Sequence, residues 1–451
     1  MGSTTNVGLD AVLERARLSR FQVGVVVMCG LVALLDGFDT QSIAFAAPDI
    51  ARDWDVASSA FGLVFGIGLF GGLVGAVISG PLSDRIGRRP VLLSAVALFG
   101  VVTLVTPFTG SIGGLVVVRL VTGFGLGAAL PGIISITTEY VPVRMRTTAV
   151  ALMFAGFPLG AALGGLASAR LMPSHGWQSV FYLAGIAPLL LLPVLWLRLP
   201  ESARFLVLRG DREALARVLT RMDLPAPQVE GLSAEPTSGH SPVARLFTDR
   251  RAPGTLLLWA TLFLSLLLTY FLTNWIPLVA RQTGIGAAKA ILGVVALNIG
   301  AIIGSFLVGR LADRMNATVV IGASFALGAL AIAAIGLSGS SAAILLVTAF
   351  TAGGLSIGAQ MTTVALCADF YETSLRATGV GWSMGVGRVG AITGPVLGGV
   401  LIAAGINAPS LFLLTGLASL GAAVAVLALG RVLPRRAPAE DAGLSAAAIP
   451  A

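Results

Sequence analysis

The segment GPLSDRIGRR, residues 80–89, follows a long apolar stretch and recurs in shortened form as GRLADRM, residues 309–315. Other features recur in the same order along the chain. Glu139 precedes Arg146 by the same interval at which Asp369 precedes Arg376. Glycines repeat as well, and the two matching sets are Gly156, Gly160 and Gly164 and then Gly390, Gly394 and Gly398. Matches that keep one order predict a chain built from two homologous halves.

The composition is typical of a protein embedded in a membrane. Of the 451 residues, 56% are hydrophobic and 11% are charged, and the mean hydropathy is +0.92. A soluble protein would have about 25% charged residues. We therefore expect a polytopic membrane protein in contact with a lipid bilayer.

Several other classes are excluded by what the chain contains. Cys29 and Cys367 both fall in apolar segments, so neither a disulfide framework nor a zinc site is expected. The net charge of +8 is carried by residues that flank apolar segments, which argues against a nucleic-acid partner. The sequence has no P-loop and no cluster of nucleophile, base or metal ligands, so we expect neither ATP-driven transport nor an enzyme.

Twelve apolar stretches are separated by turn-rich or charged segments, and a membrane-crossing helix needs about 20 such residues. The first is too long for the core of a signal peptide, so we expect an uncleaved span. The stretches predict an all-α fold of twelve transmembrane helices in two pseudo-symmetric six-helix bundles, 21–199 and 254–432. A terminus (1–20), a central loop (200–253) and a tail (433–451) complete the chain. The expected spans are 21–46, 59–79, 91–108, 112–135, 148–171, 178–198, 254–280, 288–309, 318–337, 341–367, 378–404 and 409–430.

The basic residues predict the orientation in the membrane. Most of the 29 Lys and Arg residues lie in the N-terminus, the even-numbered connections and the tail. Only Arg52, Arg170, Arg281 and Lys289 fall in odd-numbered connections. Because basic residues collect on the cytoplasmic side, both termini and the central loop are expected in the cytoplasm.

Two acids interrupt the first span, in the stretch LLDGFDTQ, residues 34–41. Asp36 and Asp39 are three residues apart and share one face of a helix. A carboxylate near the middle of a bilayer costs about 2.5–3.5 kcal/mol on insertion scales. The pair is a candidate for proton coupling, with Asp39 the first choice. Alternatively, each acid only pairs with an arginine and holds helices together.

Two arginines lie within predicted spans. Arg119 and Asp39 each sit about 10 Å inside the outer ends of their helices, so an ion pair between them is geometrically allowed. Such a pair could be structural, or Arg119 could release Asp39 to bind substrate. Arg388 has no acid in the apolar core of the second half, and its guanidinium could hold a substrate carboxylate. An interdomain pair with Asp36 is the alternative.

Amides and aromatic side chains are expected near the depth of Arg388. They would suit a flat aromatic acid, whose ring stacks while its polar groups form hydrogen bonds. The same residue types also settle at membrane interfaces or bond to a neighbouring helix. The candidate substrate contacts are Tyr270, Asn274, Trp275, Asn298, Gln360 and Trp382.

The repeated loop resembles the signature of the major facilitator superfamily. The DGFD motif, residues 36–39, resembles the aromatic acid:proton symporter family, and so do Tyr270 to Pro277 and Gly379 to Arg388. The resemblance implies that Asp36 and Asp39 are essential for transport. It also implies import of a small aromatic carboxylate such as a hydroxybenzoate, with the proton as coupling ion and no other cofactor. We expect a monomer in a bacterial inner membrane. Transport of another organic acid, export, or a non-transporting sensor are the alternatives.

The loop residues are expected to gate transport. They lie at the cytoplasmic ends of the spans, where Asp84 can accept hydrogen bonds from a helix N-terminus and latch the two halves. Alternatively, the arginines only fix the topology. The shortened second copy predicts an asymmetric latch. The candidate gating residues are Gly80, Asp84, Arg85, Arg88, Arg89, Glu139, Arg144, Arg146, Asp313 and Arg314.

Overall fold

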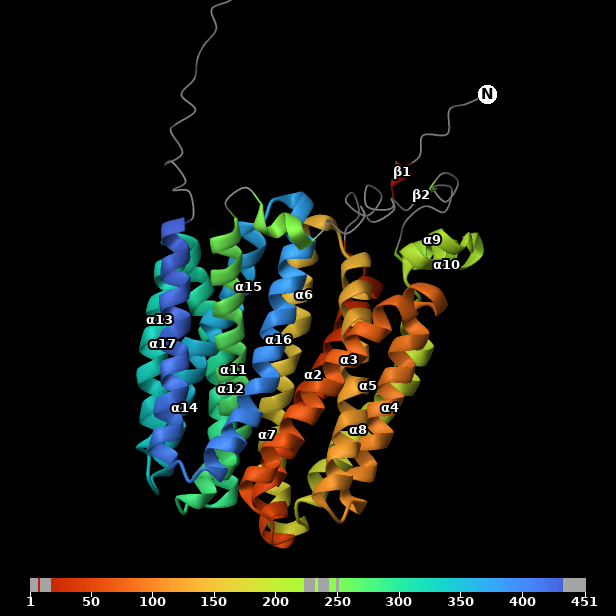
Figure 1. Ribbon diagram of the computed structural model, residues 1–451. Helices are drawn as coiled ribbons and strands as arrows, with labels where there is room; N and C mark the ends of the chain where they lie inside the picture. Colours follow the sequence, from red (N-terminus) through yellow and green to blue (C-terminus); the bar gives the residue numbers. More distant parts are fainter. Residues whose placement is uncertain (1–6, 9–17, 223–231, 234–242, 249–250, 433–451) are drawn as a thin grey trace, which may run out of the picture.

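The computed structural model describes residues 7–8, 18–222, 232–233, 243–248 and 251–432. Within these ranges, twelve helical segments are long and apolar enough to cross a membrane, which confirms the all-α, twelve-span fold (Figure 1). Spans five and ten each consist of consecutive helices. In chain order the spans are α2 (Arg20–Asp53), α3 (Phe61–Ile86), α4 (Arg88–Val105), α5 (Ile112–Glu139), α6 (Arg146–Phe154) with α7 (Gly156–His175), α8 (Gln178–Arg198), α11 (Ala252–Gln282), α12 (Ala287–Arg314), α13 (Ala317–Gly336), α14 (Ala342–Ala352) with η6 (Gly353–Ile357) and α15 (Gly358–Phe370), α16 (Thr373–Ala403) and α17 (Ala408–Val432).

The central connection contains structure that the sequence did not predict. Two short helices, α9 (Ala203–Arg209) and α10 (Arg212–Arg221), follow span six, and Leu206, Leu215 and Leu219 bury their side chains against the first bundle. A two-residue parallel pair joins β1 (Val7–Gly8) and β2 (Leu232–Ser233). Most of the predicted N-terminal segment and the whole predicted tail, 433–451, lie outside the described residues.

Local signals in the sequence set the ends of several helices. Ser19 and Gln22 form a capping box at the start of α2, each side chain accepting a hydrogen bond from the other residue's backbone N–H. Asn316 caps α13 in a similar way. Gly87 has a φ of 104°, a backbone conformation that favours glycine, and it makes the turn between α3 and α4.

Glycines set the packing of the helices in the same way in both halves. A Cβ atom added to Gly160 of α7 would collide with the backbone of Leu34 in α2, and one added to Gly394 of α16 would collide with that of Leu267 in α11. The repeated glycines thus make equivalent close crossings, α2 on α7 and α11 on α16. Small residues allow such approach in membrane helices, and this is the physical basis of the sequence repeat.

The two ends of the bundle differ in how the halves meet. We call the end where α2 begins and α17 ends the terminal face, and the opposite end the distal face; α9 and α10 lie on the terminal face (Figure 1). Towards the distal face, one cluster of buried apolar side chains joins both halves, and Phe65 of α3 contacts Trp275 of α11 edge-on. Among the described residues, the other apolar clusters each belong to a single half. The halves are therefore joined towards the distal face.

Candidate functional site

Asp39 and Arg119 form a buried ion pair inside the first half. Arg119 Nη1 lies 3.0 Å from Asp39 Oδ1, and its Nη2 donates to the Asp39 carbonyl at 3.3 Å. Thr103 Oγ1 of α4 donates to Asp39 Oδ2 at 2.5 Å. Neither charged side chain is exposed by more than 4%. The structure thus contains the Asp39–Arg119 ion pair that was expected from the similar depths of the two residues. It adds Thr103 as a third partner, which the sequence gave no reason to select.

Asp36 is in a different situation, although it is on the same helix. Its side chain is buried and accepts a hydrogen bond from Thr40 Oγ1 at 3.1 Å. It makes no ion pair in the described part of the chain. Tyr270 of α11 and Arg388, in the middle of α16, lie within electrostatic range of this carboxyl group. Asp36 therefore faces the second half, whereas Asp39 is neutralised within the first.

Arg388 has the character predicted for a group that binds an anion. Its side chain is partly buried, and within the described ranges it forms no hydrogen bond and no ion pair. The alternative was an ion pair between Arg388 and Asp36 across the two halves. The two residues lie near one another, but no ion pair joins them. A guanidinium with unused N–H groups in the membrane interior favours a ligand with a carboxylate.

Three of the predicted contact residues bond to the protein itself. Asn298 of α12 exchanges hydrogen bonds with Gln41 of α2, at 3.0 and 3.3 Å, and so ties the two halves together. Asn274 donates to the carbonyl of Tyr270, one turn earlier in the same helix. Trp275 is fully buried and donates from Nε1 to the carbonyl of Pro395 at 3.1 Å. For Asn298 and Trp275 the geometry favours the alternative of bonding to a neighbouring helix, whereas Asn274 bonds within its own helix.

Gln360 and Trp382 differ from one another in position. Gln360 follows η6, a π-helical turn of a kind often found at functional sites, and its amide has no hydrogen bond in the described residues. Trp382 precedes Arg388 in α16 by six residues, so it lies about 9 Å nearer the terminal face. It stacks on Trp259 and is 48% exposed. The expectation that Trp382 lies at the depth of Arg388 is therefore wrong.

The first copy of the repeated loop is tied tightly to its own half. Glu139 pairs with Arg88 and accepts from Ser202 Oγ at 2.5 Å. Glu201, which sequence reasoning missed, accepts the backbone N–H of Arg88 at 2.8 Å and that of Arg89 at 3.1 Å. The signal available in the sequence was an acid close to a helix N-terminus, where carboxylates are favoured.

Other candidate gating residues are less constrained. Asp84 is exposed and lies 3.8 Å from Arg88, so no bond from it to the other half is present in this conformation. Arg85 is exposed, and an added Cβ atom at Gly80 would meet nothing within 4 Å. The glycine that the turn requires is Gly87, where a Cβ atom would strike Glu201.

The remaining candidates lie in the regions that follow spans four and eight. Arg146 Nε donates to the carbonyl of Thr138 at 2.8 Å, and Arg144 lies in the short turn η3 (Val143–Met145) before α6. Asp313 and Arg314, at the end of α12, are exposed and form no ion pair in the described part of the chain. In this conformation the first loop copy is bonded within its own half, whereas Asp313 and Arg314 are not ion-paired in the described residues; the asymmetric latch stays a prediction.

Tyr140 anchors the connection after span four to the one after span six. Its hydroxyl donates to the carbonyl of Glu201 at 2.6 Å, and its own carbonyl accepts from Gln22 Nε2 at 2.7 Å. Burial raises the pKa of the Tyr140 phenol, because the phenolate would lose its hydration. The hydroxyl therefore remains a donor over the physiological range.

Comparison with known proteins agrees with this architecture. The family model described as Major Facilitator Superfamily matches residues 29–367 and 258–450. A gallate transporter of Pseudomonas putida is 39% identical over 433 residues, which cover 95% of this chain and 96% of that protein. A 4-hydroxybenzoate transporter of Pseudomonas aeruginosa is 37% identical, with 94% and 96% covered.

Solved structures agree on the fold. A bacterial homolog of the human lysosomal transporter Spinster, in an inward-facing and unoccupied conformation, matches with a TM-score of 0.67. Its sequence identity is 17%, and the match covers 92% of this chain and 96% of that one. The resemblance carried by the loop and the DGFD motif is confirmed. The chain belongs to the major facilitator superfamily, among the transporters of aromatic acids.

Proposed function

We propose that the protein imports a small aromatic carboxylate together with protons by alternating access between its two halves. The named relatives transport gallate and 4-hydroxybenzoate, and they support this substrate class. The distribution of Lys and Arg supports a cytoplasmic terminal face. With that orientation, halves joined towards the distal face correspond to a carrier closed to the outside.

The observation that carries the proposal is that buried Asp36 lies near Arg388 and that neither forms an ion pair with any described residue. When Asp36 is ionised, it is an anion that competes for Arg388. When Asp36 takes up a proton, Arg388 is left to bind the carboxylate of the substrate. Binding of proton and anion would then favour one another, as symport requires.

This assignment makes Asp36, and not Asp39, the preferred residue for proton coupling. Asp39 was the first choice from sequence, but its carboxylate already has Arg119 and Thr103 as partners. We assign Asp36 the proton and Asp39 the positioning of Arg119. Arg119 would reach a substrate only by leaving Asp39, so we place it outside the resting binding site. Tyr270 is the aromatic contact that we assign to the substrate, because it lies in the same electrostatic neighbourhood.

The driving force follows from charge. One proton carried with one monoanion is electroneutral, so accumulation gains about 1.4 kcal/mol, or tenfold, per unit of pH difference. A second proton would add the membrane potential, worth about 2.3 kcal/mol per 100 mV. The dependence of substrate accumulation on the membrane potential therefore gives the number of protons transported with each substrate.

The loop on the terminal face would act as the cytoplasmic gate. The network of Arg88, Glu139 and Glu201 keeps the turn at Gly87 in one shape. We propose that exposed Asp84 meets the second half when the terminal face closes, since its carboxylate is not committed to a short bond in this conformation.

The test is uptake of 4-hydroxybenzoate, gallate and benzoate into vesicles containing the purified protein, with the outside more acidic. Collapse of the proton gradient should abolish accumulation, and uphill uptake that persists would contradict symport. Asp36→Asn should lose accumulation but retain exchange of labelled for unlabelled substrate. Thr40→Val is the matched control: it removes the hydrogen bond to Asp36 and should keep accumulation. Full accumulation by Asp36→Asn would remove Asp36 from the coupling role.

A further inference from the structure

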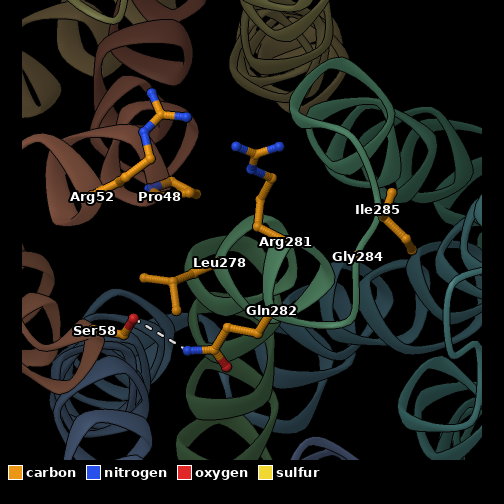
Figure 2. A pocket seen from close by; sticks show the side chains of 8 residues that line it. All are labelled: Pro48, Arg52, Ser58, Leu278, Arg281, Gln282, Gly284 and Ile285. Carbon is orange, nitrogen blue, oxygen red and sulfur yellow. Dashed lines mark hydrogen bonds between the residues drawn. The ribbon is translucent and has the colours of Figure 1, made fainter.

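A hollow with polar and apolar walls lies at the distal face, about 18 Å along α2 from Asp36. It measures about 290 Å³ and is formed by the end of α2, the turn before α3 and the end of α11 (Figure 2). Pro48, Arg52 and Ser58 come from the first half, and Leu278, Arg281 and Gln282 come from the second. Small-molecule pockets begin at about 300 Å³, so this hollow suits a ligand with a single ring.

The hollow has two guanidinium groups that share one acid. Arg281 Nη2 lies 3.4 Å from Asp49 Oδ1, and Arg52 Nη2 lies 3.5 Å from the same oxygen. Arg52 also approaches Asp53 at 3.3 Å. These distances exceed the 2.7–2.9 Å usual for charge-assisted hydrogen bonds, and each guanidinium has five N–H donors. The two arginines thus retain capacity for another carboxylate.

The remaining walls match the rest of such a ligand. Pro48 and Leu278 supply apolar surface: in Figure 2, Pro48 lies between the two arginines and Leu278 lies between them and Ser58. Gln282 Nε2 donates to Ser58 Oγ at 3.2 Å, so an amide and a hydroxyl lie on the opposite side of the hollow. Cation, apolar surface and hydrogen-bonding groups together fit an aromatic carboxylate that carries a hydroxyl.

We propose that this hollow is a second binding site, which takes the aromatic carboxylate at the outer mouth before the halves open. The proposal rests on the proposed function for the substrate class and for the outward direction of the distal face. A carboxylate bound to Arg281 replaces Asp49, and the Asp49–Arg281 pair is one of the links between the halves on this face. Arrival of substrate thereby loosens the outer closure.

The experiment measures binding of 4-hydroxybenzoate to the full-length protein in lipid nanodiscs. The wild type should bind two equivalents. Arg281→Gln should lose the outer one, and Arg388→Gln should lose the central one. Arg170→Gln removes a cation from the distal end of α7, outside the hollow, and should bind as the wild type does. Thermal unfolding confirms that each variant is folded.

The possible outcomes separate this proposal from the proposed function. A single equivalent that disappears in Arg388→Gln overturns the second site and leaves symport intact. No binding and no uptake by the wild type would instead contradict the proposed function. Asp49→Asn removes the competing acid, so outer-site affinity should rise several-fold. Unchanged affinity in Asp49→Asn would overturn the exchange of Asp49 for substrate.

Discussion

The two halves of the molecule share their backbone packing but differ in where they carry charge. Gly160 crosses Leu34 in the first half as Gly394 crosses Leu267 in the second, so the repeat places Leu272 where the first half has Asp39. The same comparison of α5 with α14 places Ala349 at the position of Arg119. Both Leu272 and Ala349 are fully buried.

The second half therefore shows that this packing does not need an ion pair. Buried ion pairs can often be replaced by apolar residues without loss of stability, because desolvation offsets most of the attraction. Helix packing alone therefore does not account for the Asp39–Arg119 pair. The difference also separates the roles across the interface: the first half supplies the acids, and the second supplies Arg388, which has no acid from its own half in the apolar core.

The largest expected effect comes from disrupting the close glycine crossings that both halves contain. Gly160→Leu and Gly394→Leu should each prevent recovery of folded protein, because even a Cβ atom collides with the backbone of the crossing helix. Gel filtration and thermal unfolding of purified protein measure the loss. Gly24→Leu in α2 is the control, since a Cβ atom there meets nothing within 4 Å. Normal folding of Gly394→Leu alone would mean that the two crossings are not equivalent.

A smaller effect is expected from removing the Asp39–Arg119 ion pair, which the second half lacks. Asp39→Asn leaves Arg119 buried without its counter-ion, and removal of one partner of a buried pair costs about 3–5 kcal/mol. The double variant Asp39→Asn/Arg119→Gln should recover much of that stability, because it resembles the uncharged second half. It should not recover transport. Thermal unfolding of the wild type, both single variants and the double variant gives the coupling energy. Additive losses would contradict the pairing.

The sequence predicted the fold well because its signals are local or repeated. Apolar length gave the spans, and the glycine repeat corresponds to close helix crossings that any two-half bundle requires. Matching depths also anticipated the pair of Asp39 and Arg119.

Contacts between distant segments could not be predicted in the same way. Nothing in the spacing shows that Asn298 meets Gln41, because that contact depends on how the halves meet. Nor does it show that Trp275 reaches Pro395, because that contact depends on how α11 packs against α16. The choice between Asp36 and Asp39 had the same limit: which acid lies beside Arg119 depends on helix rotation.

The smallest expected effect concerns the two loop copies. Glu139→Gln removes the charge that Arg88 and Ser202 share, which should cost about 1–2 kcal/mol of stability and slow uptake. Asp313→Asn alters an exposed side chain without an ion pair in the described residues, so stability should change by less than about 0.5 kcal/mol. Initial uptake rates in vesicles, beside thermal unfolding, compare the two variants. If Asp313→Asn slows uptake as much as Glu139→Gln while stability stays unchanged, then Asp313 gains a partner only when the terminal face closes. The lack of a partner for Asp313 would in that case be a property of this one conformation of the carrier.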